Sequence, residues 1–109
     1  MEIKNIASAS PFDSDKYVAE EFLEGTQSNV RIIKLAPGTV LPPHKHGTSD
    51  LMLYVAAGTA ALETEAGVVD FKSGDLAFIA CDEELRVSNQ ASEGVILLAF
   101  LTPKFPPRG

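Results

Sequence analysis

The sequence contains a single cysteine, Cys81, so it cannot form an internal disulfide. Three acidic residues, 82–84, follow this cysteine and no basic residue adjoins it, whereas a catalytic thiol needs a neighbouring base. We therefore interpret Cys81 as a small filler residue rather than a nucleophile. The 109 residues suffice for one domain, and 45% hydrophobic with 22% charged residues is the composition of an ordinary folded protein.

Basic residues are also few. Nine Lys and Arg against fifteen Asp and Glu give a net charge of −6, which argues against binding to nucleic acid or to an anionic membrane surface. The longest apolar run, residues 95–101, is too short to span a bilayer. The first five residues lack the basic-then-apolar layout of a signal peptide. We therefore expect a cytoplasmic protein with neither a nucleic-acid nor a membrane partner.

The sequence also lacks any sustained helical periodicity. Glycine and proline recur at short intervals, and the stretches between them are rich in β-branched and aromatic residues. Hairpin signals occur at residues 56–58 and at Ala66-Gly67. About eight short strands of this kind are typical of a β-sandwich or barrel. The expected strands are 16–23, 30–35, 50–55, 59–64, 64–71 (divided at Ala66-Gly67), 76–80, 85–89 and 95–101.

Alternation within these strands indicates which side chains face the interior. The expected inward sets are Leu51, Leu53 and Val55; Leu85, Val87 and Asn89; and Val69 with Phe71. Residues 95–101 do not alternate and are apolar on both faces, so one face needs the core and the other needs a second sheet, the tail or a second subunit. The tail, 102–109, holds three prolines and is expected to be an extended strap or disordered, with Phe105 as its apolar anchor.

The two histidines, His44 and His46, are spaced so that both can act on one ligand. In an extended segment residues i and i+2 point the same way, so both imidazoles can converge on one ion. Such a pair is a common half-site for Zn, Fe, Mn, Ni or Cu. A pair of exposed loop histidines is the alternative interpretation.

The histidine pair lies in a pattern that resembles the first motif of the cupin family. Gly38, both histidines and Gly58 match that motif, and Gly74-Asp75 with Asn89 resembles the second. The resemblance covers about residues 30–101 and implies an all-β, double-stranded β-helix or jelly-roll barrel of about eight to ten short antiparallel strands. It implies one cupin-like domain over 1–109, with its core at 30–101 and the tail as a strap. Such proteins hold their site in one mouth and are often homodimers.

The departures from the family pattern concern the metal ligands. The resemblance places Leu51 where the family has a glutamate and Leu85 where it has a third histidine. Asp50 precedes the first position by one residue, and such an offset turns a side chain to the opposite face unless a bulge re-aims it. We therefore expect either no cofactor or a divalent metal (Zn, Fe, Mn, Ni or Cu) held weakly by His44 and His46, with Asp50 as a further candidate ligand.

Leucines at these two positions make the lining of the barrel mouth more apolar, which favours a small-molecule pocket. A packed barrel interior is the alternative. The expected pocket residues are His44, His46, Leu51, Leu53, Leu62, Phe71, Leu85 and Asn89.

Three functions remain open. The first is a small-molecule-binding cupin-like homodimer with a degenerate metal site. The second is a cupin enzyme of dioxygenase or isomerase type that uses His44 and His46 with a metal, or one histidine as a metal-free general base. The third is a non-catalytic interaction module, in which Met52 and Tyr54 contact a partner.

Overall fold

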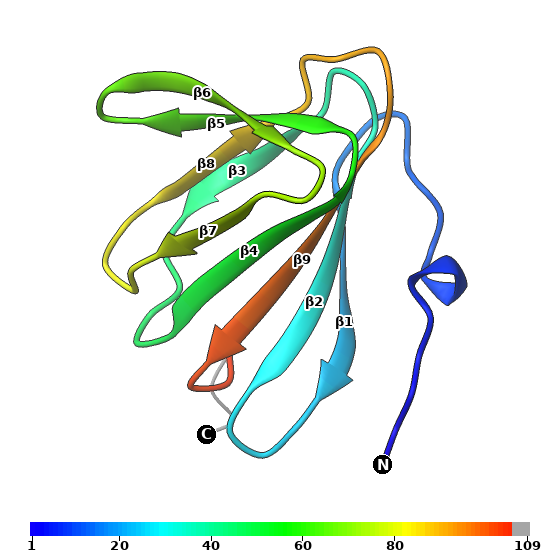
Figure 1. Cartoon of the computed structure of the whole chain (residues 1–109), viewed down its shortest axis with the longest axis vertical. Helices are drawn as coiled ribbons and strands as arrows, with labels where there is room; N and C mark the ends of the chain where they lie inside the picture. Colours follow the sequence, from blue (N-terminus) through cyan, green and yellow to red (C-terminus); the bar gives the residue numbers. More distant parts are fainter. Residues whose placement is uncertain (106–109) are drawn as a thin grey trace.

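The computed structural model describes residues 1–105, and these form two antiparallel sheets with almost no helix (Figure 1). One sheet has the strand order β1-β2-β9-β4-β7 and the other β3-β8-β5-β6. The expected all-β fold of eight to ten short strands is confirmed. No helix within residues 1–105 has the length and apolar character needed to cross a membrane. The elements are η1 (Ile6–Ser8), β1 (Val18–Glu24), β2 (Asn29–Leu35), β3 (Val40–His44), β4 (Asp50–Ala57), β5 (Thr59–Thr64), β6 (Gly67–Lys72), β7 (Leu76–Ile79), β8 (Leu85–Ser88) and β9 (Val95–Thr102).

The core lies between the two sheets and follows the expected alternation. On β4, Leu51, Leu53 and Val55 are fully buried, while the alternating Met52 is half exposed. Strand β9 lies at the centre of the five-stranded sheet and contributes one alternate set of side chains to this core. Burying one such leucine contributes roughly 1.5–3 kcal/mol, so this row is a main source of stability. The buried core side chains are Ile33, Leu35, Leu41, Leu51, Leu53, Val55, Ala60, Phe71, Ile79, Leu85, Val87, Val95, Leu97, Ala99 and Leu101.

Strand β3 was not expected from the sequence, because it contains Pro42 and Pro43. Proline donates no backbone hydrogen bond and is confined to edge strands or bulges. Strand β3 is the edge of the four-stranded sheet, and its pairing with β8 becomes irregular between Leu41 and His44, where the prolines lie. An edge position thus allows an extended segment to carry the two prolines and deliver His44 to the end of the sheets.

The hairpin expected at residues 56–58 is wrong. Strand β4 pairs with β7 and β9, whereas β5 pairs with β6 and β8, so the chain passes at Gly58 from one sheet to the other. The backbone of Gly58 has φ +82°, and a Cβ there would lie 2.4 Å from the carbonyl oxygen of Gly94. Residues 56–58 therefore form a corner between the two sheets and not a hairpin. The second expected hairpin is confirmed, since Thr64 pairs with Gly67 across a two-residue turn.

Val69 faces the same side of its strand as Phe71, as expected, because it pairs with Leu62, but it is not buried. Phe71 on the same strand is buried, but Val69 is 46% exposed. Residues 63–70 are all exposed, because the β5–β6 hairpin extends beyond the opposite sheet (Figure 1). Alternation continues along β6, but the core does not reach its first half.

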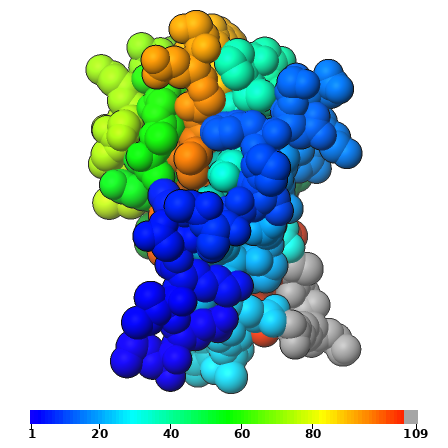
Figure 2. All heavy atoms as spheres, turned by 90° about the vertical axis from the view of Figure 1, so that its right-hand side faces the viewer, coloured from blue at the N-terminus to red at the C-terminus, as the bar shows by residue number. Residues whose placement is uncertain are grey.

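The N-terminal segment covers part of the outer face of the five-stranded sheet (Figure 2). The ammonium group of Lys4 lies 5.4 Å from the ring centre of Phe22 on β1, and Lys34 on β2 lies 5.4 Å from that of Phe12. Ile32, whose side chain points to this face, is only 1% exposed. The segment therefore covers β1 and β2, while apolar side chains of β4, β7 and β9 on the same face stay exposed.

Candidate functional site

A cavity of about 260 Å³ opens between the sheets at the end where β3 and β9 finish and β2 and β4 begin. Four of the expected pocket residues line it, namely His44, His46, Leu51 and Leu85. Within residues 1–105 the lining is Tyr17, Ala19, Arg31, Ile33, Leu41, Pro42, His44, His46, Leu51, Leu85, Ala99, Leu101 and Phe105.

Four other expected pocket residues lie elsewhere. Leu53 and Phe71 belong to the packed core, and Leu62 packs against it from the four-stranded sheet. The buried side-chain amide of Asn89 donates hydrogen bonds to the carbonyl oxygens of Leu35, at 2.8 Å, and Glu93, at 2.7 Å. Asn89 therefore fastens the loop before β9 to the sheet, away from the cavity.

The two histidine rings lie together, as the i, i+2 spacing suggested. Their ring centres are 4.5 Å apart and the ring planes meet at 63°. Nδ1 of His44 lies 2.8 Å from the carbonyl oxygen of Pro42. Because a carbonyl oxygen only accepts, this nitrogen carries the proton, and in the neutral ring Nε2 is the acceptor.

His46 is the more buried of the pair, with 5% of its surface exposed. Its Nδ1 is buried and has no hydrogen-bond partner within the described part of the chain. Burial first, and then the positive charges of His44 and Arg31, lower the pKa of His46 to about 4. At neutral pH this ring is uncharged and offers one donor and one acceptor.

The metal donors are too few for a tight site. Leu51 and Leu85 are 0% and 2% exposed and present hydrocarbon to the cavity. Asp50 is exposed and pairs with Thr102 on β9 outside the cavity. Within residues 1–105 no group of three or more His, Cys, Asp or Glu side chains lies close enough to hold a metal ion. Two imidazoles beside a guanidinium do not fit a tightly held divalent metal, which takes three or four protein ligands in its usual sites.

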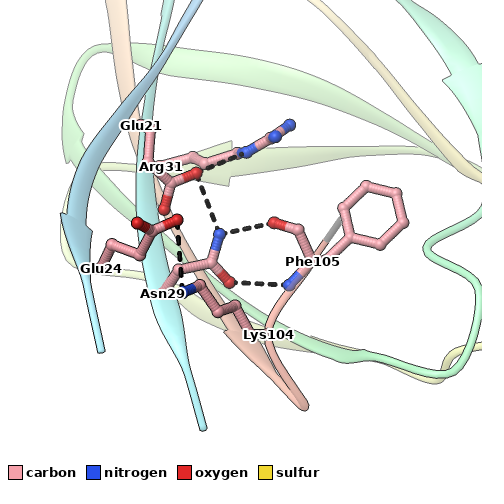
Figure 3. Close-up of polar contacts among 6 residues, drawn as sticks. All are labelled: Glu21, Glu24, Asn29, Arg31, Lys104 and Phe105. Atoms are coloured by element: carbon pink, nitrogen blue, oxygen red, sulfur yellow. Dashed lines mark hydrogen bonds and ion pairs between the residues drawn. The ribbon is translucent and has the colours of Figure 1, made fainter. Parts of the chain in front are cut away.

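Arg31 is a cavity residue that the sequence analysis did not identify. It lies on β2, where it shares the inward face with Ile33 and Leu35. Its Nε donates to a carboxylate oxygen of Glu21 on β1 at 3.2 Å (Figure 3). The alternation of residues 30–35 carries the signal that could have found it, since an arginine two residues before Ile33 must face the same way.

Phe105 closes one side of the cavity, and Asn29 holds it there. The side-chain amide of Asn29 accepts a hydrogen bond from the backbone N–H of Phe105 at 3.0 Å and donates one to its carbonyl oxygen (Figure 3). The phenyl ring lies 5.4 Å from the ring of His46 and 5.7 Å from the guanidinium of Arg31. The part of the expected strap that the structure describes, residues 102–105, therefore reaches the cavity mouth, and residues 106–109 lie outside the described chain.

Comparison with known proteins agrees with this architecture. The sequence profile of the cupin domain matches residues 31–101. The chain is 33% identical over 72 residues to the pectin degradation protein KdgF of Dickeya dadantii, which covers 66% of this chain and 64% of that protein. The chain thus spans less than two thirds of the length of this relative.

Solved structures show the same fold at lower identity. Protein TT1209 from Thermus thermophilus has a TM-score of 0.86 at 21% identity, over 95% of this chain and 99% of that one. KdgF from a Halomonas species has a TM-score of 0.70 at 17% identity, over 80% of each chain. Two antiparallel sheets around a small cavity define a double-stranded β-helix protein. The chain belongs to the cupin family.

Proposed function

We propose that this cupin binds a small organic molecule in the cavity beside His44 and His46, without a tightly held metal. The observation that carries the proposal is a cavity of about 260 Å³ in which His44, His46 and Arg31 stand among mainly apolar walls. A packed barrel interior would leave no such space.

The shape and lining of the cavity support a small ligand. Leu51 and Leu85 give it apolar walls, and a few polar groups converge on it. Small-molecule sites have this character, and their volumes run from about 300 to 1,000 Å³. A cavity of about 260 Å³ lies just below that range, so the ligand is smaller than a typical drug.

Two measurements test this proposal. In the first, neutral and charged fragments are titrated into isotope-labelled protein, and the methyl resonances of Leu51 and Leu85 are followed by NMR. We expect hits that shift these signals and leave those of Leu53 unchanged, and a screen without such hits would refute ligand binding. In the second, untagged protein is analysed for metals. We expect far less than one ion per chain, whereas one transition metal per chain would refute the metal-poor site.

A catalytic role is the second candidate, favoured by the neutral imidazole of His46 at the cavity wall. A neutral histidine can accept a proton from a bound molecule as a general base. The test is chemical conversion of the bound fragments, followed by NMR over hours, with wild-type protein and with His46→Ala. Fragments recovered unchanged from the wild-type protein would contradict catalysis while leaving binding intact.

A second copy of the chain is the partner that we propose for the uncovered outer face of the five-stranded sheet. There Met52 pairs with Phe78 on β7 and with Phe100 on β9, and these three side chains are 50%, 56% and 40% exposed. The neighbouring row, Tyr54 with Leu76 and Leu98, is also uncharged. A two-fold contact places identical patches together, and an uncharged patch lets two chains of net charge −6 meet without opposing carboxylates.

The oligomeric state tests this surface. We expect a light-scattering mass near twice 11.6 kDa at micromolar concentration for the wild-type protein. Phe78→Lys should lower that mass to about one protomer, and Val69→Lys, a change at a similarly exposed residue of the other sheet, should not. A wild-type mass of one protomer would refute the homodimer.

A further inference from the structure

Among the described residues, 1–105, the cavity lining contains one permanently charged side chain, that of Arg31. No other lining residue in this part of the chain is acidic or a lysine. Its side chain is 31% exposed, so the guanidinium is partly removed from water. Partly desolvated charges are normally compensated by a partner of opposite sign.

The compensation that the protein supplies is incomplete. Glu21 accepts only the Nε–H of Arg31, and within residues 1–105 the two terminal nitrogens, Nη1 and Nη2, make no hydrogen bond or ion pair. Figure 3 shows these terminal nitrogens directed away from Glu21, on the side where the ring of Phe105 lies. The aromatic ring attracts the cation without using its N–H donors.

We infer that the ligand of the proposed cavity carries a carboxylate, which the free Nη1 and Nη2 donors of Arg31 bind as a fork. This inference rests on the proposed function, because it names the chemical class of that ligand. The planar fork of a guanidinium matches the two oxygens of a carboxylate. One guanidinium, already shared with Glu21, suits a single negative charge better than a doubly charged phosphate.

The remainder of the ligand is apolar. Beyond the guanidinium most of the wall is hydrocarbon, from Ile33, Leu41, Leu51, Leu85, Ala99 and Leu101, together with the ring of Phe105. Tyr17, His44 and His46 are the other polar residues of the lining. The class is therefore a small monocarboxylate with a compact apolar body and at most one or two further polar groups.

Glu21 and Asn29 are positioning residues for this site. One carboxylate oxygen of Glu21 accepts from Arg31 Nε at 3.2 Å and from the side-chain amide of Asn29 at 3.0 Å. The same amide holds the backbone of Phe105. The orientation of the arginine fork and the placement of the ring over the cavity thus depend on one connected set of bonds.

The experiment compares each fragment that binds, in its carboxylate form, with its uncharged primary amide, beginning with benzoate and benzamide at constant ionic strength. We expect wild-type protein to bind the carboxylate about tenfold more tightly, a difference of about 1.4 kcal/mol, because hydrogen bonds to a charged group are stronger than those to a neutral amide. Arg31→Gln should abolish the preference while amide binding persists, and Arg31→Lys should retain part of it. Arg86→Gln is the matched control, since Arg86 is 50% exposed and pairs with Glu84 outside the cavity.

The outcomes separate the two proposals. Fragments that bind without preference for the carboxylate, or a preference that survives in Arg31→Gln, would overturn the inference and leave small-molecule binding standing. A screen with no hits at all would overturn the proposed function, and the inference with it. If Arg31→Gln does not fold, the wild-type protein is compared with Arg31→Lys instead. A preference for the carboxylate that is unchanged in Arg31→Lys would exclude binding by Nη1 and Nη2 of Arg31.

Discussion

The side-chain amide of Asn29 bonds both backbone groups of Phe105, although the two residues are 76 positions apart in the chain. Asn29 begins β2 and is 2% exposed, so the second strand of the chain holds the segment that follows the last strand. One buried amide therefore holds Phe105 in place at the mouth of the cavity.

The first prediction concerns this amide. Asn29→Ala should lower the free energy of unfolding by about 1–3 kcal/mol, because the backbone groups of Phe105 and the carboxylate of Glu21 lose partners. Amide hydrogen exchange at Phe105 should also become faster. Asn89→Ala removes a buried amide far from the cavity and should lower stability without changing exchange at Phe105. Unchanged exchange at Phe105 in Asn29→Ala would show that Asn29 does not hold this segment in place.

The second prediction distinguishes a cavity from a packed interior. Ala99 lines the cavity and Ala60 lies in the core, and both are almost fully buried. Ala99→Leu should change stability by less than about 1 kcal/mol and weaken fragment binding, because the added carbons enter free space. Ala60→Leu should destabilise by about 1–3 kcal/mol through overpacking. Urea denaturation measures both, and equal losses would indicate that no usable cavity exists.

The third prediction concerns pH. The folded pKa of His46 is about 4, below the unfolded value of 6.5, so the unfolded chain binds more protons between these values. The contribution of His46 to the free energy of unfolding is therefore full above about pH 6.5. It falls by about 3 kcal/mol as the pH drops toward 4. His46→Gln should lose this part of the pH dependence while the carboxylate contribution remains. Parallel stability curves for wild type and variant would disprove the shift.

The fourth prediction concerns the corner at Gly58. Gly58 and Gly38 have nearly the same φ, +82° and +83°, but a Cβ at Gly58 would meet backbone at 2.4 Å whereas one at Gly38 would meet nothing within 4 Å. Gly38→Ala should therefore cost only the left-handed backbone strain, about 1–2 kcal/mol. Gly58→Ala should cost at least about 1–3 kcal/mol more, through displaced backbone. Thermal unfolding of the two variants measures the difference, and similar values would show that the corner relaxes freely.

Much of the fold could be predicted from the sequence, because burial of one face imposes alternation. The buried positions of Leu51, Leu53 and Val55 follow from it directly. Alternation does not report where the opposite sheet ends, which is why Val69 lies on the predicted face but stays exposed. Local turn chemistry also cannot tell a hairpin from a corner, since Gly58 supplies the same backbone freedom to either.

The site was predictable only in its local part. His44 and His46 are two residues apart, so their convergence follows from the extended chain. Arg31 reaches them through the pairing of β2 with β9, and Phe105 through its hydrogen bonds to Asn29. Both connections span long sequence separations, which no local pattern encodes. Whether the terminal nitrogens of an arginine are free also depends on which of its nitrogens bonds to the ion-pair partner, and only the structure shows this.

The two prolines of β3 have a consequence for self-association along the sheet. Strand β3 is an edge, and an edge strand with free amide hydrogens can recruit a strand from another molecule. Pro42 and Pro43 have no such hydrogens, so the rim next to the cavity cannot be extended by a foreign strand. Strand β3 thus brings His44 to the cavity and also prevents other molecules from adding strands at this edge of the sheet.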